Sequence, residues 1–212
     1  MVAKTTERAT TLEPKASHAP TARDRLLAAA DELFYAEGVH VVGVDRIVER
    51  AGVTKASLYN IFGSKDELVR AYLEQHFRER QRRIARILAA YNTPRERLLG
   101  VFAEIEGALA SSEFRGCRFI RATAEALPGE ASEIVAEEYR AWLRSLFTHL
   151  AKAVGASDAK QFGTQLFLLY DGAAVAARMD KDRGAAAKAV RSAVVALLDT
   201  AIPSKRSSRR AS

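Results

Sequence analysis

The chain has 212 residues, of which 28% are charged, with a formal net charge of +7 and one cysteine. A single cysteine excludes an internal disulfide framework and is typical of a reducing compartment. The sequence shows neither a signal-peptide core nor an apolar run of ~18 residues, so secretion and membrane spanning are not expected. We therefore predict a cytoplasmic protein of one large or two small domains.

The positive charge is unevenly distributed along the chain. Residues 1–83 carry 14 basic and 12 acidic side chains, residues 84–202 carry 15 and 14, and residues 203–212 carry four basic ones and no acid. Most of the excess therefore lies in a C-terminal tail that is expected to be disordered. This tail either adds salt-sensitive affinity for DNA or only keeps the chain in solution. Net charge alone is a weak indication of nucleic-acid binding.

The first predicted helix follows residues 1–19, which are polar, patternless and expected to be disordered. Thr21 with Asp24 is a helix-start signal, and Gly38 is a stop signal. Between them, apolar residues recur at helical spacing, namely Leu26, Leu27, Ala30, Leu33 and Phe34. Residues 39–44, VHVVGV, have strand propensity, but a single strand has nothing to pair with, so this segment is predicted to be a loop.

Residues 44–67, VDRIVERAGVTKASLYNIFGSKDE, are the most informative stretch. They begin with a short helix whose apolar stripe consists of Ile47, Val48 and Ala51. Gly52 suits the left-handed conformation that ends a helix, and Thr54 suits the N-cap of the next one. This order of helix, glycine turn and helix predicts a helix-turn-helix, whose second helix enters the DNA major groove. The alternative is an ordinary helical hairpin with a solvated outer face.

The second helix of this motif is predicted to have two different faces. At ~100° per residue, Leu58, Ile61 and Phe62 share one side, which is expected to be buried. Ala56 and Asn60 lie most nearly opposite. Asn suits an adenine edge and Ala a thymine methyl group, whereas Lys and Tyr on the flanks suit phosphates. The outer face is therefore predicted to contact DNA.

The motif resembles the DNA-binding signature of the TetR family of transcriptional regulators. The resemblance is carried by VTKASLYNIFGSKDEL and the preceding ARDRLLAAADELFYAEGV, and it extends from about Thr21 to His76. It implies a homodimeric, all-helical, ligand-responsive repressor. The positions that match the family's DNA-contacting residues are Thr54, Lys55, Ala56, Ser57, Tyr59, Asn60 and Lys65. Gly43 departs from the family pattern, because it offers no hydroxyl where Ser or Thr usually caps the first helix of the motif.

The rest of the chain is predicted to be helical as well. Ser64-Lys65-Asp66-Glu67 has the pattern of a capping box and predicts a long helix from Lys65 to about Ala90. Later helices are predicted at residues 95–111, 116–126, 130–154, 158–179 and 183–201. The predicted fold is all-α with about nine helices. It comprises an N-terminal three-helix helix-turn-helix DNA-binding domain, residues 20–66, and a C-terminal helical effector-binding and dimerisation domain, residues 67–202.

Aromatic and apolar residues recur on the helical stripes of this second domain. They form either a packed core or, in part, a pocket for a small and largely apolar effector. Asp171 interrupts an apolar segment and therefore needs a salt-bridge partner or a ligand. The candidate pocket residues are Phe102, Ile105, Cys117, Ile120, Arg121, Tyr139, Trp142, Phe167, Tyr170 and Asp171.

The last two predicted helices are rich in small residues, Gly172 among them, which allow helices to approach closely. In the family the corresponding pair builds a four-helix interface with a second copy. A two-fold dimer would suit a palindromic DNA site with two half-sites. The alternative is packing within a monomer.

Enzymatic classes find little support in the sequence. The one Glu-x-x-His spacing, Glu37 to His40, is broken by Gly38, and neither a G-x-S-x-G nor a P-loop pattern is found. Cys117 has no second cysteine with which to bind a metal, and is either a buried apolar residue or a redox sensor. We expect no catalytic residue, no cofactor and no metal.

Together these patterns predict a sequence-specific DNA-binding transcriptional regulator. It is expected to be a repressor that a small-molecule effector releases from a palindromic operator. Two other classes stay open. One is a sequence-independent, nucleoid-type DNA binder, and the other is a helical small-molecule carrier or enzyme without DNA binding.

Overall fold

The structure, a computed structural model, describes residues 19–202 except residues 125 and 181. This part of the chain forms nine α-helices and no strand, which confirms the predicted all-α class. The two tails predicted to be disordered lie, apart from residue 19, outside the described residues. Of the helices that the structure describes, none combines the length and apolar character needed to cross a membrane.

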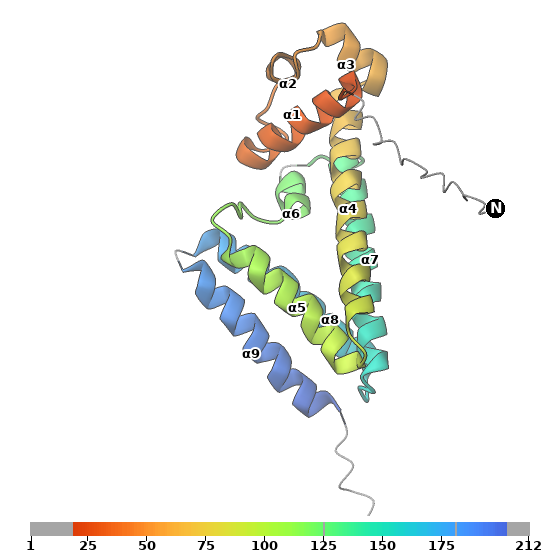
Figure 1. Cartoon of the computed structure of the whole chain (residues 1–212), viewed down its shortest axis with the longest axis vertical. Coiled ribbons are helices and arrows are strands. Elements are labelled where there is room, and N and C mark those ends of the chain that lie inside the picture. Colours follow the sequence, from red (N-terminus) through yellow and green to blue (C-terminus); the bar gives the residue numbers. More distant parts are fainter. Residues whose placement is uncertain (1–18, 125, 181, 203–212) are drawn as a thin grey trace, which may run out of the picture.

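Three short helices at one end of the molecule form a group that we call the head: α1 (Ala22–Glu37), α2 (Val44–Ala51) and α3 (Lys55–Phe62) (Figure 1). The start of α1 is the predicted capping box. Thr21 Oγ1 accepts a hydrogen bond from the Asp24 N–H at 3.1 Å, and the Asp24 carboxylate accepts one from the Thr21 N–H at 3.1 Å. The segment between α1 and α2 is a loop, as predicted.

The head has its own apolar centre, to which each of the three helices contributes. Leu26 of α1, Ile47 of α2 and Leu58 of α3 are completely buried, and Phe34 of α1 is nearly so. Burying each of these side chains contributes roughly 1.5–3 kcal/mol. Helices as short as α2 and α3 are not stable alone, so this shared core fixes how they are oriented.

Helix α4 (Lys65–Ala90) runs from the head along the rest of the molecule and lies beside α7 (Figure 1). Its bounds are those predicted. The Ser64 side chain accepts a hydrogen bond from the Glu67 N–H at 3.1 Å, but only this half of the predicted capping box forms. The Glu67 carboxylate pairs instead with Arg70, one turn further along the helix, at 3.2 Å.

The remaining helices pack with α4 into a larger helical group that we call the body. They are α5 (Pro94–Ala110), α6 (Arg118–Thr123), α7 (Ala131–Ala153), α8 (Ala159–Met179) and α9 (Arg183–Ala201). Helix α8 packs against both α7 and α9, and α5 packs against α9. Phe102, Phe147 and Leu198 are buried at these contacts and make the body one core.

Helices α7 and α8 approach each other closely at Gly163. A Cβ atom at this position would lie 2.7 Å from the Thr148 Cα atom and 2.8 Å from its nitrogen. The obstacle is backbone, which cannot rotate away as a side chain can. The glycine is therefore required by the packing of the two helices.

Helix α6 is shorter than the predicted span of 116–126. Gly116 has φ +107°, a conformation that side chains of L-residues rarely adopt and that does not belong to a helix, so the helix begins only at Arg118. Near its other end, the Thr123 hydroxyl donates to the Phe119 carbonyl at 3.0 Å. The result is a short helix placed between the head and the body (Figure 1).

Candidate DNA interface and effector cavity

The turn between α2 and α3 has the predicted geometry. Gly52 adopts the left-handed conformation, φ 62° and ψ 42°, and its N–H donates to the carbonyls of Val48 and Glu49. The Val53 N–H also donates to the Val48 carbonyl, at 3.0 Å, which closes the turn. Gly43 caps α2 without a side-chain hydrogen bond, as the lack of a hydroxyl requires. The two helices are therefore set at a fixed angle by backbone hydrogen bonds.

The outer face of α3 carries the predicted DNA-contacting residues. Thr54, Lys55, Ala56 and Asn60 are exposed, Tyr59 is 44% exposed, and Ser57 is half-buried. On the inner side, Leu58 is fully buried and Phe62 half-buried. This helix thus presents small and polar groups to solvent while its apolar side holds it on the head.

Ile61 does not share the buried side of α3 as predicted, because it is 38% exposed. At ~100° per residue, Phe62 lies about 40° to one side of Leu58, whereas Ile61 lies about 60° to the other side. The head packs against the sector between Leu58 and Phe62. Ile61 is therefore at the edge of the buried stripe and not within it.

Two polar residues at the start of α3 are held by each other. Thr54 Oγ1 accepts a hydrogen bond from the Ser57 N–H at 3.1 Å, and the two hydroxyl groups lie 2.8 Å apart.

Lys55 pairs with Asp45 of α2, with 2.9 Å between the ammonium and the carboxylate. The hydrogen bond and charge of Asp45 raise the pKa of Lys55. Lys55 is therefore charged, but Asp45 offsets part of that charge.

Lys65 differs from the α3 residues because it lies at the junction with the body. It is half-buried at the start of α4, and burial lowers its pKa, an effect that the Glu130 carboxylate opposes. The neighbouring Asp66 carboxylate accepts a hydrogen bond from the Ala131 N–H, the first residue of α7, at 3.2 Å. The start of α4 is thus tied to the start of α7.

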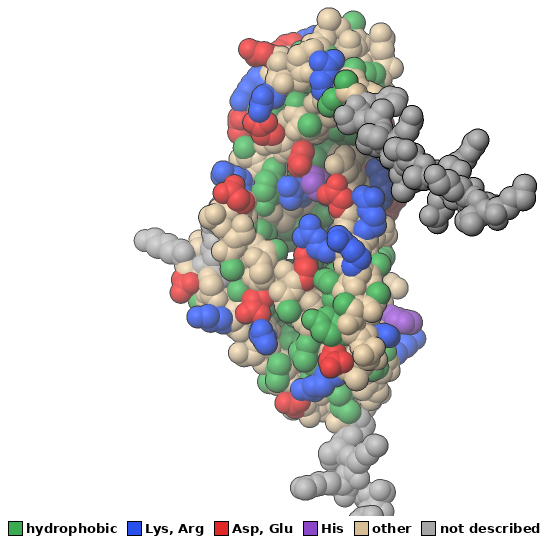
Figure 2. All heavy atoms as spheres, in the orientation of Figure 1, with side chains coloured by type: hydrophobic (Ala, Val, Ile, Leu, Met, Phe, Trp, Pro, Cys, Tyr) green, Lys and Arg blue, Asp and Glu red, His purple; other side chains and the backbone are tan. Residues whose placement is uncertain are grey.

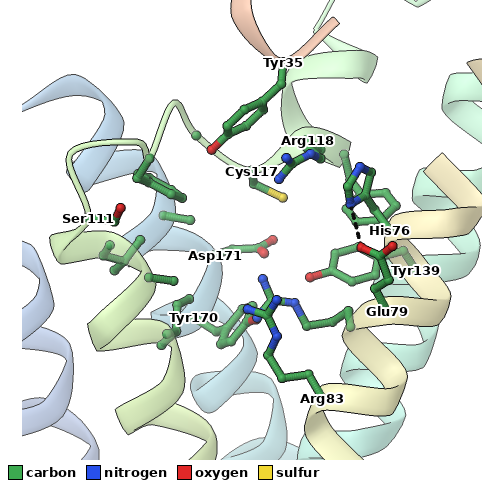
Figure 3. Close-up of a pocket in the computed structure, with 18 of the residues that line it drawn as sticks. Tyr35, His76, Glu79, Arg83, Ser111, Cys117, Arg118, Tyr139, Tyr170 and Asp171 are labelled. Carbon is green, nitrogen blue, oxygen red and sulfur yellow. Dashed lines mark ion pairs between the residues drawn. The ribbon is translucent and has the colours of Figure 1, made fainter. Parts of the chain in front are cut away.

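A cavity of about 320 Å³ lies in the body next to the head, and α4, α5, α6, α7 and α8 all contribute to its wall (Figure 3). This volume falls at the lower end of the ~300–1,000 Å³ range of small-molecule sites. The predicted pocket residues that line it are Ile105, Cys117, Tyr139, Tyr170 and Asp171. They come from three different helices, α5, α7 and α8, and from the loop before α6.

The other five predicted pocket residues do not line this cavity. Phe102 packs on Phe147 in the core, with ring centroids 5.5 Å apart, and Trp142 packs on Phe77 at 5.6 Å. The Phe167 ring lies beneath the guanidinium of Arg140, and Ile120 is half-buried elsewhere on α6. Arg121 points to the head, where it donates to the Tyr35 carbonyl at 2.5 Å.

The four basic residues of the cavity wall were not predicted. Three of them, His76, Arg80 and Arg83, lie on α4, and Arg118 is the first residue of α6. The spacing of 76, 80 and 83 is four and three, which puts these side chains on one face of a helix. The predicted pocket face was an apolar stripe, whereas this stripe of α4 is polar.

Two of the three acidic groups of the cavity, Asp171 and Glu79, are paired with side chains of the protein. Asp171 pairs with Arg140, so the salt bridge anticipated for this residue is confirmed, and burial raises its pKa. Glu79 accepts from Gln75 at 3.1 Å and pairs with His76 at 3.3 Å. Within the described part of the chain, no group of three or more His, Cys, Asp or Glu residues is placed to hold a metal ion.

Cys117 also lines the cavity, and burial raises the pKa of its thiol. Oxidation and metal binding proceed through the thiolate, which this environment disfavours at neutral pH. The raised pKa of this half-buried thiol argues against the redox-sensor alternative for Cys117.

The cavity shares a wall with the contact between head and body. The Arg118 guanidinium stacks on the Tyr35 ring of α1, with Cζ 3.7 Å from the ring centroid, and lies 3.4 Å from the Asp31 carboxylate. His76 holds the same carboxylate at 2.9 Å. Burial alone would raise the pKa of Asp31, but the hydrogen bond and charge of His76 lower it below its usual value. A change at the cavity wall therefore reaches α1 directly.

An exposed, polar helix-turn-helix joined to a larger helical body defines a class, the helix-turn-helix DNA-binding regulators. Residues 26–72 match the family described as "Bacterial regulatory proteins, tetR family". The chain is 33% identical to a TetR-family transcriptional regulator from Streptomyces coelicolor of known structure, with a TM-score of 0.82, over 86% of this chain and 96% of the other. The chain belongs to the TetR family of transcriptional regulators, and it is a helix-turn-helix DNA-binding protein.

Two further relatives, FasR and CifR, are similar to this chain over different extents. The transcriptional activator FasR of Mycolicibacterium smegmatis is 50% identical over 54 residues, so the chain spans only 25% of FasR's length. CifR, whose structure was solved with a 26-bp double-strand operator DNA, is 23% identical with a TM-score of 0.70, over 88% of this chain and 98% of CifR. The similarity to CifR shows that the two proteins share a fold. Members of the family regulate transcription and are generally not enzymes.

Proposed function

We propose that this regulator is a homodimeric, cytoplasmic repressor that binds a palindromic operator and releases it when a small molecule enters the cavity of each body. Residues 20–66 would act as the DNA-binding domain and residues 67–202 as the sensing and dimerisation domain. The observation that carries the proposal is the outward, polar face of α3, whose apolar face is held by the core of the head.

The roles on this face follow from side-chain chemistry. Asn60 suits an adenine edge and Ala56 a thymine methyl group, and both are exposed. Tyr59, Lys55 and Lys65 suit phosphates, which fix the position of the protein without reading sequence. Thr54 and Ser57, whose hydroxyls are held together, extend the contact surface at the start of the helix.

Dimerisation is supported by an exposed apolar stripe on α8. Leu168 is 61%, Val175 40% and Met179 78% exposed, and they follow one another at helical spacing with Gly172 between them. A Cβ atom on Gly172 would meet nothing within 4 Å. The neighbouring α9 carries an exposed row of small residues, namely Ala185, Ala189, Ser192 and Ala196. Large exposed apolar side chains in a row are typical of surfaces that another chain covers.

Release by an effector is supported by the position of the cavity. Its wall includes Arg118 and Tyr35, which also form the contact between the body and α1. A ligand that favours another position of α6 would therefore move the two heads relative to each other. It must bind the form that is unable to hold DNA more tightly, because the coupling between the two sites equals that difference in affinity.

Selection of bound sequences from a random pool of duplexes tests this proposal. We expect a palindrome whose half-sites are about one helical turn, ~34–36 Å, or a multiple apart. Absence of any enriched sequence, with binding lost to random competitor DNA at physiological salt, would indicate a nucleoid-type binder. Failure to bind any duplex would indicate a carrier. Loss of promoter activity on binding is the expected sign, and a gain would identify an activator.

A further inference from the structure

The cavity wall combines apolar side chains with polar and charged ones, several of which are hydrogen-bond donors. Ile105, Leu109, Phe114 and Phe119 supply apolar surface. The basic side chains that face it come from α4 and α6, and the acidic ones from α4, α8 and the loop after α5. In Figure 2, basic and acidic side chains gather around a hollow midway along the molecule. The ligand that fits the cavity depends on which of these groups the protein leaves without a partner.

Glu104 is the shared partner of two arginines. Its carboxylate lies 2.6 Å from Arg80 and 2.9 Å from Arg83. Two guanidinium groups provide about ten N–H donors, and a single carboxylate cannot use them all. By contrast, the cavity carboxylates Glu79 and Asp171 are each engaged by side chains of the protein. The remaining acid, Glu113, is exposed at the edge of the cavity.

The Tyr170 hydroxyl is a second unused donor. It is buried and makes no hydrogen bond of normal geometry, although the Tyr139 hydroxyl and the Arg80 charge influence its ionisation. Burial raises the pKa of Tyr170, so the group stays protonated and keeps its O–H. A buried hydroxyl without a partner is costly, and such a group is expected to meet one when a ligand is bound.

From these contacts we infer that the effector is an organic acid, a single carboxylate on an apolar body, whose acid is bound by Arg80 and the Tyr170 hydroxyl. This inference rests on the proposed role of the cavity as the effector site. A carboxylate offers acceptors only, and so it complements donors that the protein leaves unpaired. The apolar wall accommodates the rest of the molecule. The cavity of about 320 Å³ is roughly twice the ~150 Å³ cavity that holds benzene, so a two-ring aromatic acid or a short fatty acid fits.

Binding measurements on the full chain without DNA test this inference. The probes are benzoate, 2-naphthoate and decanoate, each compared with its own uncharged amide by calorimetric titration. We expect at least one acid to bind about ten-fold or more tightly than its amide, which is the effect of a charged hydrogen bond. If no acid binds more tightly than its amide, including the case in which none binds, the inference is wrong.

Variants locate the acid within the cavity. Arg80→Gln is expected to reduce the ratio of acid to amide affinity to about one, and Arg80→Lys to restore part of it. Arg82→Gln makes the same change on the same helix at an exposed position outside the cavity wall, and is expected to leave the ratio unchanged. Equal loss of acid and amide binding in Arg80→Gln would contradict the assignment, because it would show a general disturbance of the cavity.

Tyr170→Phe is a second variant that is not expected to disturb folding, because it removes only an oxygen that has no hydrogen-bond partner. We expect it to fold as the parent does and to lower the acid preference several-fold. An unchanged preference would exclude the hydroxyl from the site. If an acid binds the cavity but leaves the operator complex intact, the acid site stands, but the acid is not the effector and the proposed release mechanism fails for it. If DNA binding is confirmed and no acid binds, the inference fails and the DNA-binding part of the proposed function stands.

Discussion

The head and the body use their polar side chains in opposite ways. In the head, the polar residues of α3 point outward from short helices that a small apolar core holds in place. In the body, Arg80, Arg83, Arg118 and Tyr170 line a cavity to which several helices contribute. An outward face follows from the order of residues within one helix. An inward-facing site follows from how several helices are rotated against each other, which no single segment encodes.

The largest expected effect is a loss of operator affinity, because DNA binding by the heads is expected to depend on dimerisation through the bodies. Leu168→Glu places a charge in the exposed stripe of α8 and is expected to separate the dimer. Each head would then meet one half-site alone, which lowers operator affinity by about 100-fold or more. Sedimentation and operator titration measure the two effects together. Leu127→Glu, at another exposed leucine, is the matched control, and a dimeric Leu168→Glu variant would contradict the interface.

The next prediction concerns the packing of α7 against α8 in the body and does not involve the head. Gly163→Ala would put a methyl group 2.7 Å from the Thr148 backbone and is expected to lower the free energy of unfolding by ~1–3 kcal/mol. In Gly107→Ala the new Cβ atom meets nothing within 4 Å, so this variant should instead gain ~0.5–1 kcal/mol, as alanine does in helices. Thermal unfolding compares them. Equal stability of the two variants would show that α7 and α8 lie further apart.

Two substitutions in the head separate base reading from phosphate contact. Asn60→Ala is expected to lose ~1–3 kcal/mol of discrimination between the operator and variant sites, because it removes an amide that reads an adenine edge. Lys65→Ala is expected to weaken all duplexes alike and to lower the salt slope by about one. Titrations at several salt concentrations distinguish the two. The roles are wrong if both variants change operator and random DNA equally.

The smallest expected effect concerns the acid that pairs with Lys55. Asp45→Asn removes a carboxylate 2.9 Å from the Lys55 ammonium and leaves that charge for DNA phosphate. Affinity for any duplex should rise a few-fold, with a salt slope steeper by about one. Asp199→Asn removes the same charge at a residue of α9 and serves as the control. An unchanged slope for Asp45→Asn would place Lys55 away from the phosphates.

The helix bounds were largely predictable because capping is local. Thr21 and Ser64 each accept the expected hydrogen bond from a residue three positions on, and the long helix ends at Ala90 as predicted. Errors arose where tertiary contacts decide. Ile61 is exposed because the head packs slightly to one side of it, and α6 is shortened because Gly116 takes a left-handed conformation.

Only half of the predicted pocket residues line the cavity, because tertiary contacts also decide which side chains face it. Tyr139 and Tyr170 were predicted as aromatic residues on helical stripes, and Asp171 as an interruption of an apolar segment, and all three line it. Arg80 and Arg83 sit in a run of charged residues that reads as a solvated face, and only the packing of α5 against α4 turns them inward. Arg121 was expected in the pocket, yet it reaches the Tyr35 carbonyl of the head instead.

The central claim is that the outward face of α3 reads a particular duplex sequence. Its most direct test is a competition titration at physiological salt between the selected palindrome and random duplex of equal length. A ratio of dissociation constants of about 10³ or more is predicted, since specific regulators reach that range. A ratio near one, unchanged by Asn60→Ala, would contradict the claim.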